Sequence, residues 1–239
     1  MKTTGLFTIH EFTINIKELG EPIYFYPFGD VHKDAPLHSS DKWQEFLDMV
    51  KSKKNSYFIG TGDYLDFMSA TERSSFKSGK FHDSTVSTLE DLADKHVDAF
   101  YRDISFMQGR LVGLMEGNHY FQYSSGITST QKLCEKLKCK YLGVVTMTRL
   151  KFYWKGKSAV KDIYAHHGKG AARLLGGSLN RVQQMAESAE ADIYLMGHDH
   201  KGPIGFNPCI KLSQSMGHLQ VVERKKFYGR TGSFLRGYV

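Results

Sequence analysis

The chain has few cysteines, and their spacing does not suit a structural role. Among its 239 residues there are three, Cys134, Cys139 and Cys209, which is an odd number with no C-x-x-C pair. This pattern indicates neither a disulfide framework nor a zinc–thiolate site. We therefore expect the cysteines to be reduced thiols.

Long apolar runs are also missing. Residues 1–10 contain no sustained apolar stretch like that of a signal peptide, and no run elsewhere approaches the roughly 18 to 20 apolar residues of a membrane span. These absences predict a soluble, cytoplasmic protein with no membrane partner. They leave the oligomeric state open.

Internal repeats, low-complexity tracts and clear linkers are absent as well. Because 41% of the residues are apolar, the chain can bury a substantial core, and we expect a single domain over residues 1–239. The formal net charge of +7 favours acidic partners such as phosphates or nucleic acid, although ordinary solubility explains it equally well.

What is present is an alternation of apolar strand and helix patterns. Strands are predicted within residues 5–26, at 56–60, 111–115, 141–145 and 192–196, and in a hairpin of 149–154 with 159–164. Helices are predicted after the cap pair Asp41 and Gln44, after the Ser87–Glu90 capping box, from Thr128 to Lys138, and after Ser178. The pattern predicts a surface loop over 69–84, a mobile loop over 168–177, and short strands and turns after residue 200.

Five of the predicted strands end in side chains that can bind metal ions. They are Asp30 and His32, Asp63, Asn118 and His119, His166 and His167, and His198 and His200. Imidazole, carboxylate and one amide oxygen, with no thiolate, suit Mn, Fe or Zn. In an open α/β sheet the carboxyl ends of the strands converge on one crevice, so these residues would meet there.

Each of these short motifs alone is more often a surface turn than a site. Five in a row, each directly after a strand, favour one shared metal centre over five independent turns. A carboxylate such as that of Asp63 is also costly at the end of a buried strand unless a cation meets it.

In their order along the chain, these motifs resemble those of the calcineurin-like metallophosphoesterase superfamily. The matching residues are Asp30-Val31-His32, Gly62-Asp63-Tyr64-Leu65-Asp66, Gly117-Asn118-His119, His167-Gly168 and Gly197-His198-Asp199-His200. The resemblance spans residues 30–200 and implies a four-layer α/β/β/α sandwich with two central mixed sheets. The expected domain carries a loop-plus-helix insertion at about residues 67–109.

The resemblance also implies a role for each matching residue. Two divalent cations would bind in the crevice, Mn²⁺ in the first place and Fe, Zn, Ni or Mg as alternatives. Asp30, His32 and His200 would hold the first ion, Asn118, His167 and His198 the second, and Asp63 would bridge both. His166 is the alternative to His167 as a ligand. His119 would be the catalytic residue, oriented by Asp66.

The substrate is predicted less directly. The superfamily commonly has an acidic residue where this chain has Tyr120, which argues against its phosphoprotein phosphatase branch. With the basic net charge, this favours a two-metal phosphodiesterase acting on DNA or RNA, like a nuclease.

Lys169 and Arg173 are the predicted substrate contacts, because they directly follow the strand that ends at His167. The basic, aromatic hairpin 149–161 is either a nucleic-acid contact or an ordinary solvated hairpin. The alternative functions are a small-molecule phosphodiesterase or phosphatase, for example for a cyclic nucleotide, and a non-catalytic scaffold of the same fold.

Overall fold

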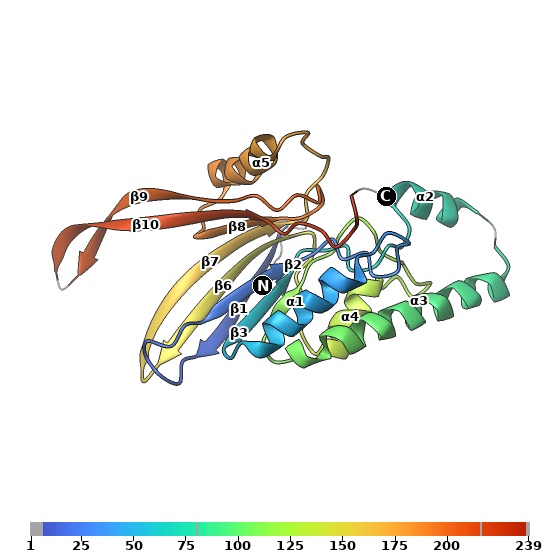
Figure 1. The fold of residues 1–239 in the computed structure, drawn as a ribbon, viewed down its shortest axis with the longest axis horizontal. Coiled ribbons are helices and arrows are strands. Elements are labelled where there is room, and N and C mark those ends of the chain that lie inside the picture. Colours follow the sequence, from blue (N-terminus) through green and yellow to red (C-terminus); the bar gives the residue numbers. More distant parts are fainter. Residues whose placement is uncertain (1–6, 80, 216, 238–239) are drawn as a thin grey trace.

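Two β-sheets face each other, and helices cover the outer face of each (Figure 1). The computed structural model describes residues 7–79, 81–215 and 217–237. Helix α5 (Leu175–Ser188) covers one sheet, while α1 (Ser40–Ser52), α3 (Asp83–Ile104) and α4 (Ser129–Leu137) cover the other. The four-layer α/β/β/α arrangement predicted from the sequence is therefore confirmed.

The sheet under α5, here called the large sheet, is mixed. Its strands lie in the order β1 (Thr8–Asn15), β6 (Val145–Trp154), β7 (Lys157–His166), β8 (Ile193–Met196), β10 (His218–Arg230) and β9 (Ile204–Ser215). The hairpin pairs β6–β7 and β9–β10 are antiparallel, and the other neighbours are parallel.

The small sheet is parallel over the strands that the structure describes. Their order is β2 (Tyr24–Phe28), β3 (Ser56–Gly60), β4 (Leu111–Leu114) and β5 (Lys140–Tyr141). Successive residues of β3 point to opposite faces, so Phe58 packs against the helices and Ile59 against the large sheet. Because both faces are buried, β4 is apolar throughout, and β3 is apolar after Ser56, so neither strand alternates.

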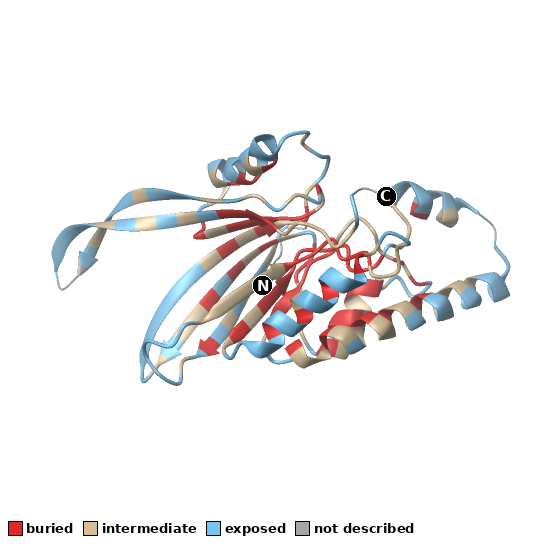
Figure 2. Cartoon of the chain, in the orientation of Figure 1, coloured by how far each residue is buried: buried red, intermediate tan, exposed pale blue. Residues whose placement is uncertain are grey.

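The space between the sheets is filled by apolar side chains from both. The small sheet side contributes Ile59, Val112, Met115 and Leu142, and the large sheet contributes Leu150, Ile163, Ala165 and Leu195. Figure 2 shows the buried residues concentrated where sheets and helices meet.

The segment predicted as a surface loop contains the short helix α2 (Ala70–Ser78). Its start carries a capping box in which Ser69 and Glu72 satisfy each other's backbone N–H groups. Apolar periodicity misses this helix because few of its residues are apolar. Helix α3 also begins earlier than predicted, at Asp83 and not after Ser87, with a negative charge in its first turn that the helix dipole favours.

Two more predicted caps are wrong. Ser39, and not Asp41, is the N-cap residue of α1, and its hydroxyl donates to the Asp41 carboxylate. Ser178 lies inside α5, which begins at Leu175 within the predicted mobile loop.

The capping box of α4, formed by Thr128 and Gln131, is confirmed. The predicted strand 141–145 is divided between the end of β5 and the start of β6. A short 3₁₀ turn, η1 (Ser105–Met107), leads from α3 towards β4.

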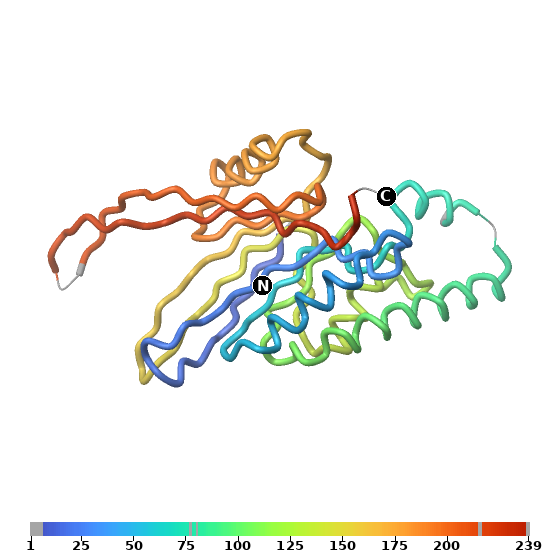
Figure 3. The backbone as a smooth tube through the Cα atoms, viewed as in Figure 1, coloured from blue at the N-terminus to red at the C-terminus, as the bar shows by residue number. Residues whose placement is uncertain are grey.

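The C-terminal part of the chain differs most from the prediction. In place of short strands and turns, β9 and β10 form one long hairpin that reaches beyond the body of the molecule (Figures 1 and 3). After β10 the chain crosses the loop that follows β2, where the Phe234 N–H donates to the Asp30 carbonyl at 3.0 Å. The Phe234 ring packs against Trp43 of α1, with 4.9 Å between the ring centroids.

Within the described ranges, the helices are too short or too polar to span a membrane. We expect the N-terminal stretch to lack a signal peptide. Its first residues, 1–6, lie outside the described ranges.

The packing between the sheets makes a testable prediction at Leu150, which is 2% exposed. Replacing it with alanine leaves a cavity between the sheets, so Leu150→Ala should lower the free energy of unfolding by about 2–5 kcal/mol. Urea denaturation followed by circular dichroism measures this loss. The matched control is Leu19→Ala at a position 58% exposed, where we expect almost no change. Equal effects of the two variants would contradict the two-sheet core.

Candidate metal centre

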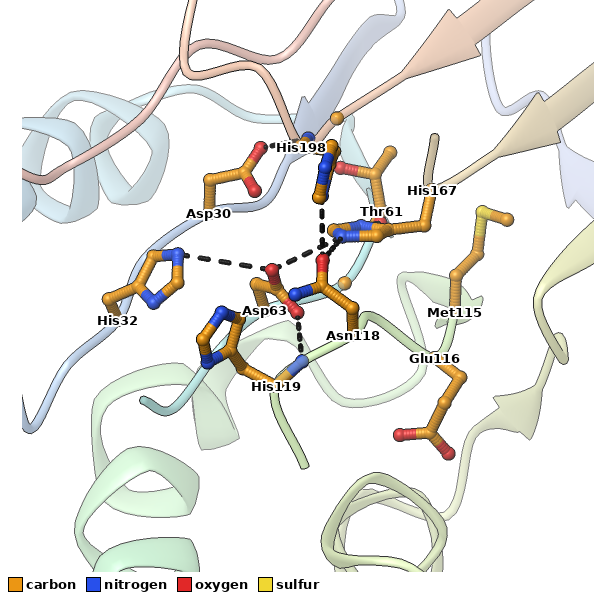
Figure 4. A network of polar contacts seen from close by, with 12 residues as sticks. Asp30, His32, Thr61, Asp63, Met115, Glu116, Asn118, His119, His167 and His198 are labelled. Atoms are coloured by element: carbon orange, nitrogen blue, oxygen red, sulfur yellow. Dashed lines mark hydrogen bonds and ion pairs between the residues drawn. The ribbon is translucent and has the colours of Figure 1, made fainter. Parts of the chain in front are cut away.

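The metal-capable side chains predicted from the sequence lie together where five strands end (Figure 4). Asp30, Asp63 and Asn118 follow β2, β3 and β4 of the small sheet. His167 and His198 follow β7 and β8 of the large sheet. The site is therefore built across the two sheets, where the carboxyl ends of their strands meet.

The backbone at this site is unusual. Five site residues that are not glycine have a left-handed backbone, with φ between 45° and 76°: Asp30, His32, Asp63, His198 and His200. Such backbone costs of order 1–3 kcal/mol per residue and clusters at functional sites, where the surrounding structure enforces it. The strain provides an indication of function that is independent of the residue types.

Glycines let the strand ends approach one another. A Cβ at Gly117 would overlap the Asp63 carboxylate, and one at Gly62 would lie 2.6 Å from the His167 Nδ1 atom. Gly62 also has a φ of 108°, which strongly favours glycine. The glycine that precedes Asn118 is thus required by contact with Asp63 from the neighbouring strand.

One cluster contains Asp30, His32 and His200, whose ligand atoms lie within 4.8 Å of one another. The His200 Nε2 atom is 3.8 Å from the Asp30 Oδ1 atom. In the described part of the chain, Asp30 Oδ1 and His32 Nε2 are buried polar atoms without a hydrogen-bond partner. Orphaned buried donors and acceptors are costly, and a shared cation would satisfy both.

A second cluster contains Asp63, His167 and His198. Asn118 joins it, because its Oδ1 atom is 2.9 Å from His167 Nε2 and 2.6 Å from His198 Nδ1. The backbone carbonyl of Thr61 accepts from His167 Nδ1 at 2.8 Å, which turns Nε2 towards the cluster. Thr61 was not identified from the sequence, since a carbonyl contact of this kind leaves no residue-type signal.

The Asp63 carboxylate belongs to the second cluster and also faces His32 of the first (Figure 4). Its Oδ2 atom is 3.1 Å from His167 Nε2 and 3.9 Å from His32 Nε2. Its Oδ1 atom accepts from the His119 backbone N–H at 2.8 Å. A single carboxylate that is 2% exposed therefore contacts residues of both clusters.

Protons compensate part of the buried charge. Burial raises the pKa of Asp30 to about 7, against the opposing charge of His167. Burial lowers the pKa of His167, but the hydrogen bond and charge of Asp63 outweigh it, so the net shift is upward. Burial raises the pKa of Asp63, but the hydrogen bond and charge of His167 outweigh it, so the net shift is downward. The raised pKa favours a proton on His167 at the place where a cation would bind, and a bound metal ion would have to displace it.

His198 and His200 have lowered pKa values, which favour the neutral form. Burial is the main cause that lowers the pKa of His198, and the charge of the nearby His167 lowers it further. For His200 the main cause is also burial, and the charge of the nearby His32 adds to it. Neutral imidazole is the form that coordinates metal ions.

Asp66, predicted to orient His119, lies beside both His32 and His119. Its Oδ1 atom hydrogen-bonds His32 Nδ1 at 2.8 Å and lies farther, at 3.4 Å, from His119 Nδ1. His119 Nδ1 instead hydrogen-bonds the Phe67 carbonyl at 2.9 Å. Asp66 thus holds His32 most directly, in the manner of a carboxylate behind a metal-ligating histidine.

Arg73 of α2 supports the loop that carries Asn118 and His119. Its guanidinium donates to the carbonyls of Asn118 at 2.9 Å and Tyr120 at 3.2 Å, and also to that of Met68. The same guanidinium stacks over the Tyr120 ring at 3.5 Å. Tyr120, the departure from the superfamily pattern, is therefore part of this support. Arg73 was missed because its helix was predicted as a loop.

Two more buried carboxylates support the loops. Burial raises the pKa of Glu116, and the hydrogen bonds that it accepts from Thr128, Thr130 and Tyr141 offset this rise only in part. Asp199 accepts from Ser178 of α5 and faces Arg230 at 3.5 Å. Helices α4 and α5 therefore contact the strand-end loops through satisfied polar groups.

The remaining predicted residues lie outside the clusters. His166 is the last residue of β7, and burial lowers its pKa, but among the described residues it joins neither cluster, so the geometry favours His167. Lys169 and Arg173 are exposed on the loop between β7 and α5. Lys169 is close enough to affect the charge of His166.

Comparison with known proteins adds no argument to this geometry. No protein-family model matches the chain, and a search of curated proteins found no match. Among solved structures it is similar to a Vps29 single mutant from Entamoeba histolytica. The identity is 16% over 90% of this chain and 77% of that chain, with a TM-score of 0.38. A likeness this remote carries no inference about fold, metal, substrate or activity.

The contact between Gly117 and Asp63 makes a prediction about cation binding. In Gly117→Ala the added Cβ must push the Asp63 carboxylate aside, so we expect Mn²⁺ affinity to fall at least about tenfold, a loss of about 1.4 kcal/mol. Titration calorimetry measures the affinity.

The matched control is Gly176→Ala in α5, where a Cβ has nothing within 4 Å. It should bind Mn²⁺ like the unmodified chain. Unchanged affinity in Gly117→Ala would contradict the placement of Asp63 in a metal centre.

Proposed function

We propose that this chain is a phosphoesterase of the calcineurin-like metallophosphoesterase superfamily that works with two divalent cations. The observation that carries the proposal is the position of Asp63, which belongs to the cluster with His167 and His198 and also faces His32 of the cluster Asp30–His32–His200. A shared carboxylate is what a two-cation site needs, because it keeps the two ions close.

The residues present fit such a pair of ions. Asp30, His32 and His200 would hold one, Asn118, His167 and His198 the other, and Asp63 both. The orphaned Asp30 Oδ1 and His32 Nε2 atoms support this assignment. Nitrogen and oxygen donors without thiolate favour Mn²⁺, with Fe, Zn, Ni or Mg as alternatives. The chemistry supplied by bound cations is activation of water and neutralisation of phosphoryl charge.

The chain's own residues orient the reaction. His119 is proposed to protonate the leaving oxygen, with its ring held by the Phe67 carbonyl and the nearby Asp66. Asp66 also positions His32 through its shorter hydrogen bond. Arg73 keeps the His119 loop in place through its two carbonyl contacts.

Mutations should separate metal binding from proton transfer. Asp63→Asn and His198→Ala should lose bound metal and activity together, because each removes a ligand. His119→Ala should keep its metal but lose about 10²- to 10⁴-fold in kcat, because only the proton donor is gone. Elemental analysis and turnover of bis(4-nitrophenyl) phosphate with Mn²⁺ measure the two properties.

Normal metal content in Asp63→Asn would contradict the ligand assignment. Absence of turnover in the unmodified chain, with metal bound, would instead support the non-catalytic scaffold.

A hollow beside His119 bears on the substrate. It has a volume of about 430 Å³ and is lined by Phe67, Met68, Phe76, Leu89, Leu92, Ala93 and Phe121, with Asp66, Glu72 and His119 at its polar side. Its position next to the proposed proton donor favours an apolar leaving group there. The carboxylates of Asp66 and Glu72 would repel a chain of phosphates, so we propose a small ester with an uncharged, apolar leaving group.

Nucleic acid is the second candidate, supported by the net charge of +7 and by exposed Lys169 and Arg173. The basic hairpin β6–β7 does not strengthen it. Its turn lies at the other end of β7 from His166, roughly 30 Å away along the strand. Arg149 is paired with Asp162, and Lys161 with Asp192, so neither charge is free.

A substrate comparison distinguishes the two candidates. With Mn²⁺ supplied, bis(4-nitrophenyl) phosphate should be hydrolysed faster than single- or double-stranded DNA or RNA. Leu89→Ala should raise the KM for the aryl ester by about five- to tenfold, because apolar contact with the ring is lost. Leu19→Ala is the control and should leave KM unchanged. Faster hydrolysis of nucleic acid, with a salt-dependent KM, would favour the nuclease instead.

A further inference from the structure

One face of the β9–β10 hairpin is apolar and exposed. It carries Ile204, Phe206, Ile210 and Leu212 from β9 and Leu219, Val221 and Phe227 from β10, each between 44% and 79% exposed. Strand pairing brings these residues to one side, with Phe206 opposite Phe227 and Leu212 opposite Val221. We call this surface the hairpin face.

The hairpin face points away from α5. Tyr228, the neighbour of Phe227, packs under α5, and Arg224 and Lys226 on the same side pair with Glu190 and Asp192. Phe227 aligns across the sheet with Ile193 and Ile163, and Ile163 lies in the core between the sheets. The hairpin face therefore continues the inner face of the large sheet beyond the small sheet.

Leaving this surface in water is unfavourable. Monomeric proteins rarely expose continuous apolar patches of this kind, and a two-stranded hairpin that packs against nothing is marginally stable. Figure 2 shows the outer part of the hairpin as exposed, and the described residues leave its apolar side chains uncovered. A second sheet face packed on it would bury these side chains.

We propose that the hairpin face binds a second copy of this chain, face to face, around a two-fold axis. The charges on the face support this choice of partner. Glu223 and Lys225 are both exposed, lie on the apolar side of β10, and have opposite signs. They are separated by one residue, Arg224.

A two-fold axis that lies between the two packed faces, perpendicular to β10 and level with Arg224, makes these charges self-complementary. It places Glu223 of one copy opposite Lys225 of the other, and the reverse contact forms at the same time. The same operation places Phe227 opposite Val221, and Phe206 opposite Leu212, so large side chains meet smaller ones. An unrelated partner would need its own matching arrangement, whereas this face supplies both halves.

Charge reversal tests the symmetry directly. Sedimentation equilibrium of the full chain should give twice the mass of 27.2 kDa at micromolar concentration. Glu223→Lys and Lys225→Glu should each weaken dimerisation at least tenfold, because each brings like charges together twice across the axis. The double variant Glu223→Lys/Lys225→Glu should restore the dissociation constant to within threefold, because the pairs re-form with reversed sign.

Control variants separate this effect from general charge or misfolding. Glu187→Lys makes the same charge change on exposed α5 and should leave the dimer intact. Leu212→Asp should give a monomer whose circular dichroism is unchanged. A monomeric unmodified chain at 100 µM would overturn the proposal, and so would single variants that the double variant fails to rescue.

Discussion

The buried Asp63 carboxylate is the constraint on which the rest of the site depends. It lies at the end of β3, and its negative charge is stable there only because other groups meet it. These groups come from three other segments of the chain. They are the backbone N–H of His119, the His167 ring and the His32 ring. Gly62 and Gly117 are needed because any side chain there would block the approach.

The loops that carry the site residues are in turn held by the helices. Arg73 of α2 binds the loop after β4, the start of α4 satisfies Glu116, and Ser178 of α5 satisfies Asp199. These are hydrogen-bonded polar groups at buried or nearly buried positions, which specify one geometry more strictly than apolar packing does. They explain how five left-handed backbone residues can persist in one place.

The two sheets have different extents, and this difference shapes the surface. Where they overlap, their facing side chains form a core between them, and their strand ends form the metal-capable clusters. Where the large sheet continues alone, as β9–β10, the same inner face remains apolar without a covering layer. One feature of the architecture therefore accounts for both the core and the exposed hairpin face.

The sequence by itself determined the set of metal-capable residues, and its resemblance to the superfamily predicted the layer arrangement. Strand periodicity is local, and ligand chemistry follows from residue type, so Asp30, Asp63, Asn118 and His198 could be found at strand ends without coordinates. The tertiary structure alone decided that His167 and not His166 faces Asp63, and that Asp66 bonds most closely to His32. It alone revealed Arg73 beneath the His119 loop and the single exposed face of the C-terminal hairpin. These features depend on contacts between segments far apart in the chain, and on strand register, neither of which a local pattern records.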